Sequence, residues 1–160
     1  MTKKLQQDSF RLFADYFQFF LMDEGVSPDA PTDWNDTDVA RRLKAAPNIV
    51  VVCPIRNMTV PVEVQIHKAE PPYDASQWDH IAECSLDLPT GKLVIHECTG
   101  GPVGRFNVAP GTYRVRAFYG ALNTLYNNDL DGDDHYLVVL WLGGQTDLRV
   151  IKEYREIHLP

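Results

Sequence analysis

The sequence lacks most of the signals that would assign a chemical activity to it. Its 160 residues contain no CxxC pair, no GxSxG or SxxK nucleophile motif and no HExxH zinc motif. Gly100-Gly101-Pro102 is rich in glycine, but proline removes an amide that a phosphate would need, and no helix pattern follows. The chain is therefore predicted to bind a partner rather than to catalyse a reaction.

Long hydrophobic runs and a signal peptide are also missing. No run reaches the roughly 18 apolar residues of a membrane span, and the basic pair Lys3-Lys4 is followed by polar residues. We therefore expect a cytoplasmic protein with no membrane contact. Its three cysteines, Cys53, Cys84 and Cys98, are an odd number within apolar strand patterns and are predicted to be free, buried thiols.

Positive charge is scarce. The chain has 15 Lys and Arg residues against 22 Asp and Glu residues, for a net charge of −7 and a pI near 5.1. An acidic surface disfavours direct contact with nucleic-acid phosphates. It suits either simple solubility or a basic protein partner such as a nuclease.

What the chain does contain is β-sheet periodicity. Residues Thr59–Lys68 and Tyr113–Tyr119 alternate apolar and polar side chains, and turn residues recur at intervals of roughly 8–12 residues. This spacing predicts a mainly β protein, an antiparallel β-sandwich of about nine strands with one short helix. We expect one domain over residues 1–160. An exposed edge strand could pair two copies of the chain, so a homo-oligomer is one of the states that the sequence allows.

Three segments carry more specific predictions. In Ser9–Leu21 the alternation changes phase near Asp15, which predicts a bend between two short strands. Thr37–Ala46 carries the helix signature, with Asn35, Asp36 and Thr37 as possible N-caps. Arg105–Tyr119 is predicted to be strand, tight turn at Pro110-Gly111, strand.

The acidic segment Asn127–Asp134 is the main candidate site. Its Asn, Asp, Asp and Gly residues match part of a calcium-binding loop, so Asp129, Asp131 and Asp133 are candidate calcium ligands of a module that binds calcium or a small ligand. The twelfth position is Val138 instead of Glu, and no helix pattern flanks the loop. Two other interpretations stay open: a solvent-exposed turn, or an acidic surface for a basic partner. In the latter case the contacting residues would be Tyr126, Asp129, Asp131, Asp133 and Asp134.

Besides partner binding and calcium binding, a further hypothesis is an enzyme whose active-site residues are dispersed along the sequence. It would combine His80, His135, Arg114 and Arg116, although no spacing in the sequence supports this grouping. Adjacent residues of a strand point to opposite faces, so Asp79 and Asp134 are badly placed to assist the histidines that follow them. Pairing with nearby acids is the simpler role for Arg114 and Arg116.

The order of these features resembles the competence protein J family, the DNA-entry nuclease inhibitors of transformable bacteria. The shared features are Asp33-Trp34, the Pro110-Gly111 turn with Tyr113, and the layout of strands between them, over roughly Phe10–Tyr119. The part after Tyr119 has no counterpart in this match. The resemblance implies a non-enzymatic protein that binds and blocks a nuclease, and an immunity protein against a toxin nuclease is a related possibility.

Overall fold

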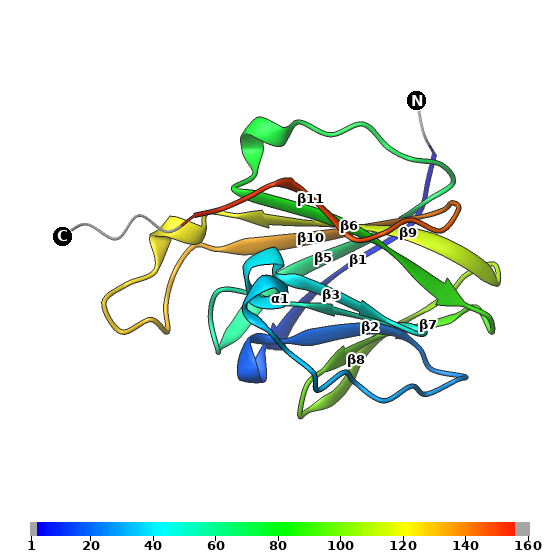
Figure 1. Cartoon of the computed structure of the whole chain (residues 1–160), viewed down its shortest axis with the longest axis horizontal. Helices are drawn as coiled ribbons and strands as arrows, with labels where there is room; N and C mark the ends of the chain where they lie inside the picture. Colours follow the sequence, from blue (N-terminus) through cyan, green and yellow to red (C-terminus); the bar gives the residue numbers. More distant parts are fainter. Residues whose placement is uncertain (1–2, 156–160) are drawn as a thin grey trace.

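Two β-sheets stacked face to face enclose the hydrophobic core of this protein (Figure 1). The structure is a computed structural model that describes residues 3–155. The larger sheet has six strands in the order β1-β5-β10-β9-β6-β11, and the smaller has five in the order β3-β4-β2-β7-β8. The prediction of a mainly β sandwich is confirmed, with eleven strands among the described residues.

The strands of the two sheets have the following bounds. In the larger sheet they are β1 (Lys4–Phe13), β5 (Thr59–His67), β10 (His135–Leu142), β9 (Gly111–Gly120), β6 (His80–Leu88) and β11 (Arg149–Lys152). In the smaller sheet they are β3 (Leu43–Ala46), β4 (Ile49–Val52), β2 (Phe19–Asp23), β7 (Lys92–Glu97) and β8 (Gly101–Asn107). The pairs are antiparallel except β5 with β10, which run parallel.

The period-2 patterns place their apolar sides in the core. On β5, Val60, Val62, Val64 and Ile66 are all buried against the opposite sheet. Removing each such side chain from water contributes about 1.5–3 kcal/mol before entropy is counted. The sandwich is thus stabilised mainly by the matched inner faces of its two sheets. Among residues 3–155, no helix is long and apolar enough to cross a membrane.

The bend predicted near Asp15 is present, and it takes the chain from one sheet to the other. Strand β1 ends at Phe13, the short 3-10 turn η1 (Asp15–Phe17) follows, and β2 begins at Phe19 in the smaller sheet. The alternation of core-facing residues is therefore shifted by one position between β1 and β2.

The helix prediction was correct at its beginning and wrong at its end. Helix α1 covers Asp36–Arg41, and Asn35 forms a capping box with Asp38. Arg42 then takes a left-handed conformation (φ 59°), and the residues from Leu43 onward form strand β3. Pairing with β4 and complete burial of Leu43 outweigh the local helix propensity, because tertiary contacts override weak local preferences.

The predicted strand–turn–strand at Pro110-Gly111 is not a paired hairpin. Strand β8 pairs with β7 in the smaller sheet, whereas β9 pairs with β6 and β10 in the larger one. The turn is a corner between the sheets, held by the Tyr113 hydroxyl, which donates to the Ala109 carbonyl oxygen at 2.7 Å. Both strands bury apolar side chains in the same core from opposite sides, which a flat hairpin could not do.

Candidate functional site

The acidic segment forms an ordered loop between β9 and β10, at one end of the sandwich (the yellow and orange loop in Figure 1). The 3-10 turn η3 (Leu122–Thr124) precedes the segment, and we call Tyr126–Asp133 the loop tip. Within the tip, the Asn128 side-chain oxygen accepts from the amides of Leu130 (3.0 Å) and Asp131 (3.3 Å). Asn128 therefore serves turn geometry, as one sequence interpretation predicted.

The loop tip is tied to the body of the protein at its base. The Arg56 guanidinium donates to the Leu130 carbonyl oxygen at 2.8 Å, and the Asp133 amide donates to the Thr124 hydroxyl at 2.8 Å. The Tyr126 amide closes the tip by donating to the Asp131 carbonyl oxygen at 2.8 Å. These contacts hold the tip in one shape while its side chains face outward.

The predicted contact residues divide into exposed and buried groups. Asp129, Asp131 and Asp133 are exposed, and Tyr126 is 61% exposed. Among residues 3–155, the side chains of Asp129 and Asp133 have no hydrogen-bond or ion-pair partner, while Asp131 accepts from the Asn128 amide group. Four of the five residues can therefore reach a partner.

Asp134 has a different position from the one its sequence context suggested. It is buried, with an ion pair of 2.6 Å between Arg56 Nε and its Oδ1, and it accepts from the Tyr136 hydroxyl. Burial and the nearby Asp134 carboxylate raise the pKa of Tyr136. Asp134 fixes the base of the loop and cannot present its carboxylate to a partner, since burial withdraws it from the surface.

The candidate calcium ligands do not converge. Within residues 3–155, no three His, Cys, Asp or Glu side chains are grouped closely enough to hold a metal ion. A hollow of about 450 Å³ beside the loop tip is lined by Asp131, Asp133 and Asp134, but also by Arg11 and Arg56. Two guanidinium groups beside the carboxylates disfavour a cation there.

The four residues of the dispersed-enzyme hypothesis are not brought together either. His80 lies on the inner face of β6, where its Nε2 bonds to the Arg41 carbonyl oxygen at 2.8 Å and its ring meets Tyr119 edge-on. Arg114 and Arg116 lie on the outer face of β9, and His135 packs on Trp78 outside the sheet. The sheet itself separates His80 from the arginines.

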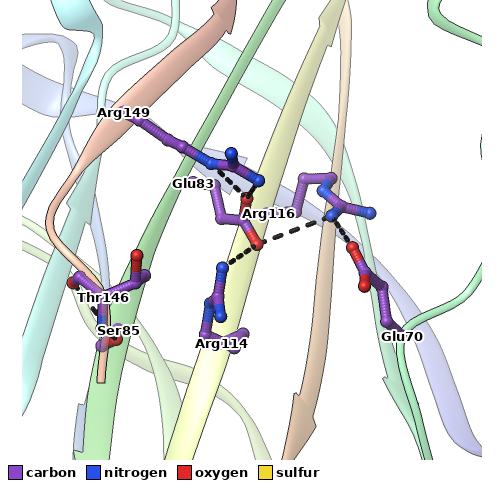
Figure 2. Close-up of polar contacts among 7 residues, drawn as sticks. All are labelled: Glu70, Glu83, Ser85, Arg114, Arg116, Thr146 and Arg149. Atoms are coloured by element: carbon purple, nitrogen blue, oxygen red, sulfur yellow. Dashed lines mark hydrogen bonds and ion pairs between the residues drawn. The ribbon is translucent and has the colours of Figure 1, made fainter. Parts of the chain in front are cut away.

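The two arginines belong to a charged group that we call the arginine cluster: Glu83, Arg114, Arg116, Arg149 and Glu70 (Figure 2). Strand register creates it, because Arg116 of β9 and Arg149 of β11 both pair with Glu83 of β6. Glu83 is fully buried and lies 3.0 Å from Arg114 Nη2, 3.5 Å from Arg116 Nη2 and 2.8 Å from Arg149 Nη2.

Arg116 is the most enclosed member of the cluster. Its guanidinium carbon lies 4.5 Å from the ring centre of Tyr73 and 4.7 Å from that of Trp141, and it also pairs with Glu70. The Glu83 carboxylate raises the pKa of Arg149. All three arginines of the cluster pair with Glu83, and Arg116 and Glu83 are buried, so the role of Arg114 and Arg116 is structural, as the pairing interpretation of the arginines predicted.

A feature that the sequence interpretation missed is an apolar hollow of about 540 Å³ at the same end of the sandwich. We call it the aromatic hollow. Its walls are Tyr16 and Phe17 of η1, Trp34, Val39 of α1 and the segment after β4, and its full lining is Tyr16, Phe17, Gln18, Trp34, Val39, Arg42, Cys53, Pro54 and Ile55. The sequence analysis named several of these residues, as a bend, a helix start, a free thiol and Trp34 of the family resemblance, but did not group them into one surface.

The thiols are free, as predicted. Cys84 is buried, and Cys53 and Cys98 are partly buried. Burial raises the pKa of Cys53 to about 12 and also raises the pKa values of Cys84 and Cys98. None of them is activated as a thiolate nucleophile at neutral pH.

Comparison with known proteins adds a fold-level likeness. No protein-family profile and no curated protein sequence matches the chain. The fold resembles a solved structure described as ComJ, inhibitor of the DNA degrading activity of NucA, from Bacillus subtilis, with a TM-score of 0.66 and 14% identity over 89% of this chain and 99% of that one. The product of crocagin biosynthetic gene J is also similar, with a TM-score of 0.60 and 19% identity over 86% of this chain and 97% of that one.

Proposed function

We propose that this protein is a non-enzymatic cytoplasmic inhibitor or immunity-type protein that binds a basic nuclease through its loop tip. The observation that carries the proposal is the ordered loop tip, whose exposed carboxylates Asp129, Asp131 and Asp133 form no ion pair with another residue of the described range 3–155. The likeness to a nuclease inhibitor over almost the whole of both chains supports it. Trp34, which the family resemblance singled out, lines a hollow at the same end of the sandwich.

The physical rationale is mimicry of a phosphate backbone. A nuclease cleft is lined with cations that accept phosphate groups, and carboxylates on a fixed loop can occupy the same positions. The net charge of −7 would steer a basic partner toward this protein and raise the association rate. The protein itself would make no direct contact with nucleic acid.

The test is an affinity capture from a native lysate of the source organism at low and then at high salt. We expect a salt-sensitive nuclease, identified by mass spectrometry, whose DNA degradation stops when the purified protein is added. The triple variant Asp129→Asn, Asp131→Asn, Asp133→Asn is the matched bait, since it keeps the loop shape and removes three charges. Capture of no nuclease at either salt, or equal inhibition by the triple variant, would contradict the proposal.

Calcium binding by Asp129, Asp131 and Asp133 is the second candidate carried over from the sequence. A ligand that binds only the folded state must raise the melting temperature by mass action. Melting in 5–10 mM calcium, against magnesium and chelator, therefore decides it. The two arginines in the adjoining hollow lead us to expect no calcium-specific shift.

A further inference from the structure

The aromatic hollow gathers large apolar side chains that remain exposed. The exposed fraction is 67% for Tyr16, 60% for Val39 and 48% for Phe17. The hydrophobic core of the sandwich, by contrast, consists of 26 buried residues. Isolated exposed apolar residues are ordinary, but three of them around one concave, mostly apolar surface are typical of a protein contact site. Aromatic residues at the edge of such a depression are the side chains that most often dominate binding energy.

The turn η1 holds its two aromatic residues in an uncommon backbone conformation. Tyr16 and Phe17 have φ values of 56° and 59°, a region that bulky residues rarely occupy. The turn is anchored from both sides: the Asn57 side-chain oxygen accepts from the Tyr16 amide at 3.1 Å, and the Thr99 hydroxyl donates to Asp15 at 2.8 Å. The fold therefore fixes the backbone that carries two exposed aromatic rings, which lowers the entropy cost of a contact with them.

The aromatic hollow is linked to the loop tip through two residues adjacent in the sequence. Ile55 lines the hollow, and the next residue, Arg56, donates to the Leu130 carbonyl oxygen in the tip and pairs with Asp134. In Figure 1 the blue turn η1, the cyan helix α1 and the yellow-orange loop all lie at the same end of the sandwich. The exposed carboxylates of Asp33 and Asp36 lie on either side of Trp34 in the sequence, and Asp33 Oδ1 is 3.8 Å from Lys44 Nζ.

An aromatic occupant is the best match for the hollow, because one of its lining residues is an arginine. Arg42 lines the hollow, and the Nε of its guanidinium group is buried without a hydrogen-bond partner. The same guanidinium already lies 5.4 Å from the ring centre of Tyr154, so it interacts with ring faces. An arriving aromatic ring could stack on the guanidinium, whereas an aliphatic group would gain nothing from its charge.

We propose that the aromatic hollow receives one protruding aromatic side chain of the basic partner, flanked by Lys or Arg residues that meet the surrounding carboxylates. This inference rests on the proposed function, because it names the chemistry of the partner segment that would dock beside the loop tip. The apolar insertion would contribute affinity, and the charged contacts would contribute orientation and association rate.

The first experiment uses two capped tripeptides as defined probes: acetyl-Lys-Phe-Lys-amide and acetyl-Lys-Ala-Lys-amide. Each is titrated to millimolar concentration into the ¹⁵N-labelled full chain and followed by amide chemical shifts. We expect saturable shifts at Tyr16, Phe17, Val39 and Ile55 with the phenylalanine peptide, several-fold larger than with the alanine peptide. Equal shifts from both peptides, or no shifts at these amides, would overturn the proposal.

Two matched variants complete the test. Val39→Lys places a charge in the hollow, and Leu142→Lys changes a similarly exposed apolar residue (48%) at the opposite end of β10. Both positions face solvent, so both variants should fold. We expect Val39→Lys to abolish the phenylalanine-specific shifts and to raise the concentration for half-inhibition of the captured nuclease at least tenfold, with Leu142→Lys within twofold of wild type.

The outcomes separate the two proposals. If the wild type inhibits a nuclease and Val39→Lys inhibits it equally well, the docking role of the aromatic hollow is overturned while the inhibitor function stands. If the wild type inhibits no nuclease, the inhibitor function fails, and the tripeptide titration alone decides whether the hollow recognises a basic aromatic segment.

Discussion

Glu83 and the carboxylates of the loop tip belong to one acidic chain but lie in opposite surroundings. Glu83 is completely buried among three arginines on the outer face of the larger sheet. Asp129 and Asp133 are exposed, and within residues 3–155 no cation pairs with them. A charge without solvent must be neutralised by its own fold, whereas a charge in solvent stays available to a partner. The contrast separates residues that stabilise the fold from residues whose charge remains available to a partner.

The largest expected effect is at the arginine cluster. Glu83→Gln removes the negative charge and leaves Arg116 buried with a single partner, so we expect a loss of about 3 kcal/mol in the free energy of unfolding. For a protein of this size, that is a drop of about 10 °C in melting temperature. Urea unfolding and thermal melts measure it.

Glu153→Gln is the control for this variant, because Glu153 pairs with Arg155 at an exposed site. Such a pair contributes at most about 1 kcal/mol. Equal effects of the two substitutions would show that Glu83 does not stabilise the sheet as the geometry indicates.

A slightly smaller effect is expected at the base of the loop. Asp134→Asn leaves the Arg56 guanidinium without its ion pair, and we expect a loss of about 2–3 kcal/mol in the free energy of unfolding, with faster amide hydrogen exchange in the loop tip. Asp133→Asn, one residue earlier and exposed, is the matched control and should leave both quantities unchanged. An Asp134 variant as stable as wild type would place that carboxylate with the binding group after all.

The third effect depends on pH and concerns His80. Burial lowers its pKa below the usual 6.5, and it accepts from the Tyr154 amide at Nδ1, so the folded state holds it neutral. Below about pH 6.5 the unfolded chain takes up a proton that the folded chain does not. Stability should therefore fall as pH falls, by up to about 1.4 kcal/mol per pH unit.

Urea unfolding between pH 7.5 and 5.5 measures this slope for wild type and for His80→Gln. The pKa of His67 is also lowered by burial, so the wild type and the variant share that contribution and their difference isolates His80. Identical slopes in the two proteins would mean that His80 takes up its proton equally in the folded and the unfolded state, and so is not held neutral by the fold.

The smallest effect on stability is expected where the effect on binding is largest. The triple loop-tip variant at Asp129, Asp131 and Asp133 removes exposed charges that form no ion pair within residues 3–155, so the free energy of unfolding should change by less than about 0.5 kcal/mol. Its nuclease affinity should fall and lose its salt dependence. A strongly destabilised triple variant would make the tip a structural element and remove the contrast with Glu83.

Local sequence pattern determined much of this protein. The alternation on β5 and β9 identified the core faces, the phase change at Asp15 located the bend, and Asn35 identified the helix start. The acidic tip was also visible as a run of exposed turn residues. These features follow from the backbone periods of strands and turns, which neighbouring residues alone decide.

Only the tertiary structure decided which segments meet. Leu43–Ala46 became a strand because β4 offered it a pairing edge, and the corner at Pro110-Gly111 joins two different sheets. The register between β6, β9 and β11 brings the arginine cluster together. The ion pair with Arg56 holds Asp134 in a buried position, away from the acidic surface. Such contacts join residues tens of positions apart, and their free energy depends on burial that no local pattern reports.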